Sequence, residues 1–102
     1  MSRNVKDTLE SRNSTHGLFE NTAKFAQDIK AQMRQGNWDA LNAVQKETLE
    51  MIATKIARVL SGNPADPEHW HDLAGYATLA EEEAEAFQEM MRSQPVAAGR
   101  RK

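Results

Sequence analysis

Two short motifs hold the residues of this chain that are best suited to chemistry. Glu47 and Glu50 form an E-x-x-E pair, and His69 and Asp72 form an H-x-x-D pair after an interval of 18 residues. Residues three positions apart are neighbours on the surface of a helix. Carboxylate oxygens are ligands that Mg²⁺ prefers in proteins. If the two motifs converge from neighbouring helices, we expect Glu47, Glu50 and Asp72 to bind Mg²⁺. His69 would be a further ligand or the catalytic base.

Two basic residues follow the E-x-x-E pair on the same predicted helix. Lys55 and Arg58 could contact phosphate oxygens, because both present donors that suit phosphate. A metal ion that bridges phosphates can polarise a phosphoanhydride and activate water. The sequence has no glycine-rich phosphate loop and no recognisable nucleophile–base motif. Nothing therefore favours a P-loop enzyme or a catalytic triad.

The same residues also have a structural interpretation. At about 100° per residue, Glu47, Thr54 and Arg58 fall within about 40° of one another, opposite the apolar side of their helix. This is what an ordinary solvated face looks like, and an isolated H-x-x-D pair often serves only local hydrogen bonds. Val44 and Met51 lie on this polar side as well. Apolar side chains there indicate contact with another helix or another subunit.

The helix that carries the E-x-x-E pair is predicted from about residue 42 to residue 61. Asn42 is a suitable N-cap, and Gln45 three residues later completes a capping box. Gly62 and Pro64 end the helix. Its apolar stripe predicts the core positions, which are Leu49, Ile52, Ala53, Ile56, Val59 and Leu60.

The next helix has the clearest start in the chain. Asp66 can cap free amides, Pro67 suits the first helical position, and Glu68 complements the positive end of the helix dipole. An apolar seam then continues at steps of three and four, through Trp70, Leu73, Ala77, Ala80, Ala84, Phe87 and Met91. We expect Trp70 to be buried in this seam. Pro95 stops the helix.

A further helix is predicted from about residue 18 to residue 35, where Gly36 ends it. Trp38 and Leu41 are expected to hold the following connector against the core. Residues 1–15 are polar and predict a flexible segment with one or two helical turns. Residues 16–92 form the helical domain, and residues 93–102 predict a disordered basic tail.

Size and composition limit the remaining possibilities. No strand pattern occurs, so the fold class is all-α, a small bundle of three main helices. A domain of 102 residues buries only about 60–65% of its unfolded surface, so we expect a homo-oligomer. The chain has no cysteine and no apolar run that could span a membrane, which favours a cytoplasmic protein. Residues 16–92 contain 7 Lys/Arg and 13 Asp/Glu. This acidic body disfavours binding to duplex nucleic acid.

Three segments of the sequence resemble a family of small phage and prophage proteins of unknown function. They are THGLFENTAKFAQDIK, NWDALNAVQKETLEMIATKIARVLSGN and HWHDLAGYATLAEE, and the resemblance covers roughly residues 10–90. It implies a cytoplasmic location in the host cell. More distantly, the two motifs look like the E-x-x-E…E-x-x-D signature of the MazG-like all-α nucleotide pyrophosphohydrolases. In that resemblance Glu47 and Glu50 match the first pair, Asp72 matches the last acid, and His69 replaces a glutamate.

Two functional hypotheses follow. The first is a helical homo-oligomer that binds a nucleotide-derived phosphate ligand between the helices carrying the two motifs. If this protein is an enzyme, it would hydrolyse a nucleotide pyrophosphate bond with Mg²⁺. The second is a non-catalytic interaction protein that sequesters a host factor or a signalling nucleotide. In that case the acidic residues form a solvated surface or face a partner.

Overall fold

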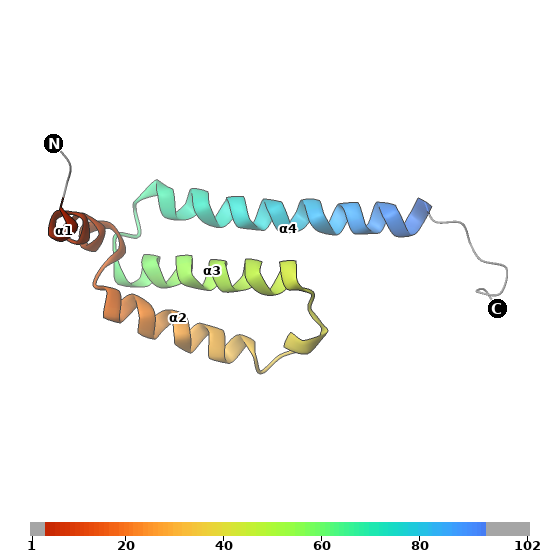
Figure 1. Cartoon of the computed structure of the whole chain (residues 1–102), viewed down its shortest axis with the longest axis horizontal. Coiled ribbons are helices and arrows are strands. Elements are labelled where there is room, and N and C mark those ends of the chain that lie inside the picture. Colours follow the sequence, from red (N-terminus) through yellow and green to blue (C-terminus); the bar gives the residue numbers. More distant parts are fainter. Residues whose placement is uncertain (1–3, 94–102) are drawn as a thin grey trace.

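The computed structural model describes residues 4–93 of the chain, and this part contains four α-helices, one short 3-10 helix and no strand. The predicted all-α class is therefore confirmed, whereas four helices replace the expected three. Figure 1 shows their arrangement. The elements are α1 (Val5–His16), α2 (Phe19–Met33), the 3-10 helix η1 (Trp38–Ala40), α3 (Ala43–Ser61) and α4 (Pro67–Ser93).

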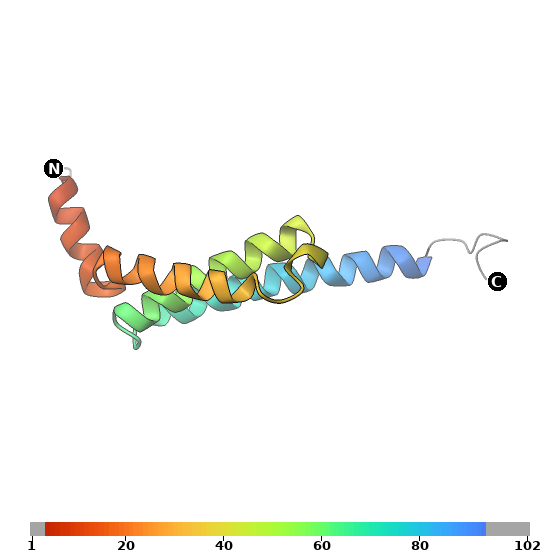
Figure 2. The ribbon, with the colours of Figure 1, turned by 90° about the horizontal axis from the view of Figure 1, so that it is seen from below.

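Helix α3 is the centre of the molecule. Helices α2 and α4 pack on it from two sides, and α1 lies across the end where α2 begins and α3 ends (Figures 1 and 2). The predicted capping box is present at the start of α3: Asn42 Oδ1 accepts from the Gln45 amide, and Gln45 Oε1 accepts from the Asn42 amide, both at 2.9 Å. Asp66 Oδ1 accepts from the Glu68 amide at 2.9 Å, as expected at the start of α4.

Helix α1 is longer than the one or two turns expected from the sequence. Asn4 caps its start, because Asn4 Oδ1 accepts from the Asp7 amide at 2.8 Å. The only apolar side chains of α1 are Val5 and Leu9, so no periodic apolar stripe indicates this helix. The flexibility predicted for residues 1–15 stays a prediction, and residues 1–3 lie outside the described residues. Most of the predicted tail, residues 94–102, also lies outside them.

The C-terminal carbonyls of α1 join the other helices. The His16 carbonyl accepts from Thr22 Oγ1 at 3.0 Å and from Ser61 Oγ at 2.8 Å, which connects α1 to α2 and α3. The Thr15 carbonyl accepts from the Asn63 amide at 2.9 Å. Free carbonyls at a helix end need such partners. Tertiary contacts thus supply what the local sequence of α1 lacks.

Two glycines allow this junction to close. Gly17 has a φ of 80°, a conformation that favours glycine, and a Cβ there would clash with the Ser61 carbonyl. A Cβ on Gly62 would clash with the Thr15 carbonyl oxygen and the His16 backbone. The sequence analysis treated Gly62 only as a helix terminator. In the structure it is also the point at which the chain after α3 crosses the end of α1.

The core of the single chain is small, and the predicted core stripe of α3 is only partly buried. The buried apolar residues of the described part are Ala26, Ala53 and Ala57. Leu49, Ile56 and Leu60 are exposed, with Leu60 58% accessible. The reason is geometric. At about 100° per residue, Leu49, Ile56 and Leu60 lie between two sides of α3. One of these sides contains Ala53 and Ala57, and the other faces α4. Neither neighbouring helix covers these three side chains.

Helix α4 also differs from the prediction in its rotation. Trp70 is 53% exposed rather than buried, and its Nε1 donates to the Pro64 carbonyl at 2.8 Å. His69 is buried instead. The face of α4 that packs on α3 is thus rotated by about 60° from the predicted seam. Because α4 has 27 residues and α3 has 19, its C-terminal end projects beyond α3 (Figure 1).

Candidate functional site

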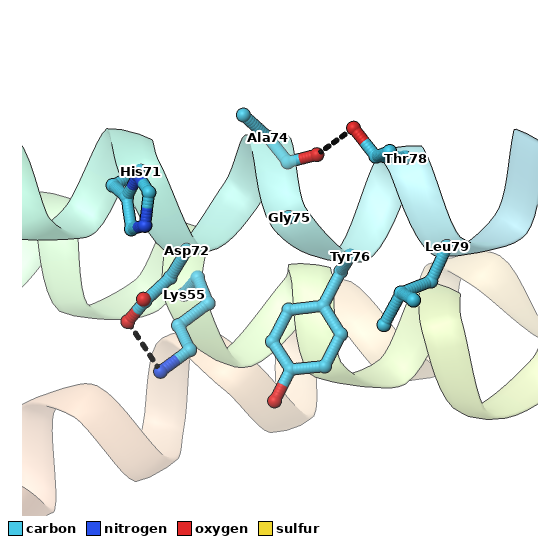
Figure 3. Close-up of a pocket in the computed structure, with 8 residues that line it drawn as sticks. All are labelled: Lys55, His71, Asp72, Ala74, Gly75, Tyr76, Thr78 and Leu79. Atoms are coloured by element: carbon cyan, nitrogen blue, oxygen red, sulfur yellow. Dashed lines mark hydrogen bonds and ion pairs between the residues drawn. The ribbon is translucent and has the colours of Figure 1, made fainter.

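An ion pair between α3 and α4 stands at the middle of the candidate site. Lys55 Nζ lies 3.0 Å from Asp72 Oδ2 (Figure 3). The lysine side chain is only 11% exposed, whereas the aspartate side chain is 38% exposed. The hydrogen bond from Lys55 lowers the pKa of Asp72 below its ordinary value, and the positive charge of Lys55 adds to this effect. The predicted metal ligand Asp72 is therefore paired with the predicted phosphate contact Lys55.

The ion pair borders an open groove of about 620 Å³ along α4. Besides Lys55 and Asp72, its lining includes His71, Tyr76 and Leu79. Figure 3 shows the Tyr76 ring and the Leu79 side chain on the same side of α4 as the ion pair. A cation together with an aromatic ring could contact a phosphate and a flat apolar group. His71 also belongs to the lining of this groove, beside Asp72.

The two acidic motifs do not meet within one chain. Helices α3 and α4 are antiparallel, with Lys55 level with Asp72 (Figure 1). At about 1.5 Å per residue, Glu47 lies about 12 Å along the helix axis from this level and Glu50 about 7.5 Å, whereas His69 lies on the other side of it. In residues 4–93, no three His, Asp or Glu side chains gather as a group that could hold a metal ion. Mg²⁺ binding itself stays a prediction.

His69, the predicted catalytic residue, has a buried position. It is 2% exposed, and its Nε2 lies 3.1 Å from the Thr15 carbonyl oxygen. Its ring also contacts the ring of His16, with centroids 5.6 Å apart. His69 does not line the groove. This placement favours the structural interpretation, in which the histidine joins α4 to the end of α1.

Arg58, the second predicted phosphate contact, lines a different pocket from Lys55. This pocket has a volume of about 120 Å³ and lies where α1, α2 and α3 meet. Its lining includes Arg12 and His16 from α1, Phe19 and Thr22 from α2, and Thr54 and Arg58 from α3. None of the described residues that line it is acidic.

His16 is a titratable side chain in the lining of this pocket, and its surroundings change its pKa. Burial lowers the pKa of His16 below its ordinary value of 6.5, and the positive charges of Arg58 and Arg12 lower it further. His69 and Lys55 act in the same direction. Its Nδ1 is buried and has no hydrogen-bond partner in the described part of the chain. The imidazole is thus held neutral beside two permanent cations.

Arg12 and His16 are the residues that the sequence analysis missed. Both belong to α1, where no motif in the sequence indicates a functional position. Only the tertiary junction brings them to Arg58.

The fold within residues 4–93 has no helix that is long and apolar enough to cross a membrane.

Comparison with protein-family models, with curated proteins and with solved structures finds no match for this chain.

Proposed function

We propose that this chain is a helical interaction protein whose working unit contains two copies. The observation that carries this proposal is the distribution of large apolar side chains. In the described part of the chain none of them is fully buried. A side of the α3–α4 pair, which we call the open apolar face, is instead left uncovered. It consists of Leu49, Ile56, Leu60, Trp70, Ala77, Ala84, Phe87 and Met91.

The two helices contribute different kinds of residue to the open apolar face. Helix α3 contributes a row of large side chains, Leu49, Ile56 and Leu60. The middle of α4 contributes the small Ala77 and Ala84, between the large Trp70 on one side and Phe87 and Met91 on the other. In a two-fold arrangement the large row of one copy lies over the small row of the other, and the reverse contact forms at the same time. Two helical hairpins that pack in this way make a four-helix bundle. This self-complementarity favours a second copy as the occupant.

The projecting end of α4 supports the same arrangement. Phe87 and Met91 lie on about the same side of α4 as the residues that pack on α3. Because Lys55 pairs with Asp72, Ala43 at the start of α3 is level with about residue 84 of the antiparallel α4, so both side chains lie beyond α3. Phe87 is 54% exposed. A stable interface buries about 800 Å² on each partner. An antiparallel second copy would cover this end and the open apolar face together.

Light scattering at micromolar concentration tests the proposal. Wild type should exceed the monomer mass of 11.5 kDa. Ala84→Glu places a charge on the open apolar face and should produce monomers. Ala86→Glu is the matched control: it adds the same charge to the same helix, but about 200° around the axis from residue 84. A monomeric wild type, or equal dissociation of both variants, would refute the two-copy unit.

Binding of a nucleotide-derived phosphate ligand is the second candidate function. The groove beside Lys55 and Tyr76 favours it, because a cation and an aromatic ring could contact a phosphate and a base. For Mg²⁺-dependent hydrolysis, Glu47 and Glu50 would need further ligands from a second copy. Pyrophosphate release from a panel of nucleoside triphosphates tests this function. Pyrophosphate release that Glu50→Gln abolishes would support hydrolysis. If no nucleotide in the panel releases pyrophosphate, calorimetry would measure nucleotide binding alone.

A further inference from the structure

The small pocket between α1, α2 and α3 has the size of a single tetrahedral anion. A water molecule in the liquid occupies about 30 Å³, so the volume of about 120 Å³ corresponds to about four waters. A phosphate group has five heavy atoms and would fit, while the rest of a larger molecule would extend outside. The pocket is formed by the consecutive helices α1 and α2 together with α3, and it is separate from the groove beside Lys55.

The lining of the pocket carries positive charge and no acidic side chain. Arg12 and Arg58 both line it, and neither forms an ion pair within the described residues. Arginine presents a planar set of donors that matches phosphate oxygens. Both arginines line a pocket that has no acidic residue in its lining. An anion in the pocket would be attracted by both positive charges.

The His16 ring and the start of α2 also belong to the lining of this pocket. The buried Nδ1 of His16 has no hydrogen-bond partner within residues 4–93, and buried polar atoms normally have one. The pocket also includes Phe19, the first residue of α2, and the N-cap residue Leu18 supplies no side-chain hydrogen bond to this helix end. Free amides at the start of a helix attract anions. The start of α2 adds to the attraction by the arginines but does not make the site without them.

We propose that Arg12 and Arg58 form a binding site for a phosphate group in the pocket that the His16 ring also lines. The ligand is free inorganic phosphate or a phosphate monoester, since both present the same tetrahedral oxyanion. The site is independent of the two-copy unit, because its residues lie on α1, α2 and α3 away from the open apolar face. It contains Arg58, one of the two phosphate contacts predicted from the sequence, but not Lys55.

Calorimetric titration of the full chain with inorganic phosphate at low ionic strength tests the site. Wild type should bind, and Arg12→Gln and Arg58→Gln should each weaken binding at least tenfold. Arg34→Gln is the control, because Arg34 is an exposed arginine at the end of α2 and does not line the pocket. A repeat with adenosine monophosphate distinguishes the two ligand sources: tighter binding than phosphate identifies the monoester, and equal binding identifies the free anion. Lack of binding by wild type, or an equal loss in Arg34→Gln, would overturn the proposal.

A second measurement keeps the proposal testable if the arginine variants fail to fold. In wild type, the NMR signals of the His16 ring should shift on addition of phosphate, and the pKa of His16 should rise because an anion stabilises the imidazolium. His71 serves as the internal control, since it lies outside this pocket. Unchanged His16 signals, or equal changes in His71, would also overturn the assignment.

Discussion

Lys55 and Asp72 form an ion pair in which the two partners differ in their access to water. Their atoms Nζ and Oδ2 are 3.0 Å apart, but the lysine side chain is 11% exposed and the aspartate side chain is 38% exposed. A buried charge without a partner is strongly unfavourable, whereas an exposed carboxylate can regain water. The pair joins α4 to α3, and its two ends should respond differently to mutation.

Asp72→Asn should lower the free energy of unfolding more than Lys55→Met does. The first change leaves a buried ammonium group without its carboxylate, whereas the second replaces this cation by an apolar chain of similar length. Urea denaturation of both variants measures the difference. Glu68→Gln, an exposed carboxylate in the first turn of the same helix, is the control for loss of a negative charge. A larger loss for Lys55→Met would contradict the asymmetry.

The stability of the protein should fall as the pH drops through about 6.5. The pKa of His16 is lowered in the folded state, mainly by burial, so between its folded and unfolded pKa values the unfolded state binds more protons. Stability is thus greatest above the ordinary pKa and decreases below it. The groups that hold the pKa down are Arg58, Arg12, His69 and Lys55. Thermal melts over this pH range give the measurement.

His16→Gln should flatten this pH dependence, and His71→Gln should not. A glutamine cannot titrate, so the linked proton uptake disappears with the His16 ring. The lowered pKa of Asp72 acts in a separate range, because that contribution is lost only as the pH falls below 3.8. If His16→Gln melts keep the wild-type slope near neutral pH, then another group is responsible.

Gly62→Ala should destabilise the protein by about 1–3 kcal/mol, the usual range for a side chain forced into a filled space. The new Cβ would clash with the Thr15 carbonyl and the His16 backbone, where α1 crosses the end of α3. Gly75→Ala is the matched substitution on α4, where a Cβ meets nothing within 4 Å. It should stabilise the helix by about 0.5–1 kcal/mol. Chemical denaturation measures both variants. If both changed stability in the same direction, the close approach of Gly62 to the end of α1 would be contradicted.

The parts of the fold that follow local rules could be predicted from the sequence. Asn42, Gln45 and Asp66 cap their helices as expected, because a cap depends on only a few neighbouring residues. The full length of α1 could not be predicted, since its C-terminal end depends on hydrogen bonds from Thr22, beyond the turn, and from Ser61, which is distant in sequence. Periodicity identifies an apolar stripe but not the neighbour that covers it.

The candidate site shows the same limit. Lys55, Arg58 and Asp72 were identified by residue type, but their grouping depends on how α3 and α4 are rotated and aligned. The structure pairs Lys55 with Asp72 and places Arg58 with Arg12 in another pocket. The residues that were expected in the core of α3, such as Ile56 and Leu60, are the ones that the single chain leaves open. The apolar pattern would then describe the assembly rather than the isolated chain, if two copies form the working unit.

Trp70 provides a direct optical test of that unit. In the single chain it is 53% exposed and lies on the open apolar face, so a second copy should exclude water from its ring. We expect the emission of Trp70 to shift to longer wavelength on dilution, as the two copies separate. Trp38→Phe removes the other tryptophan and isolates this signal. Ala84→Glu in the same background should show the long-wavelength emission at every concentration, and Ala86→Glu should follow the parent. If the emission stays constant while light scattering reports a change in mass, then the copies meet through a surface that does not include Trp70.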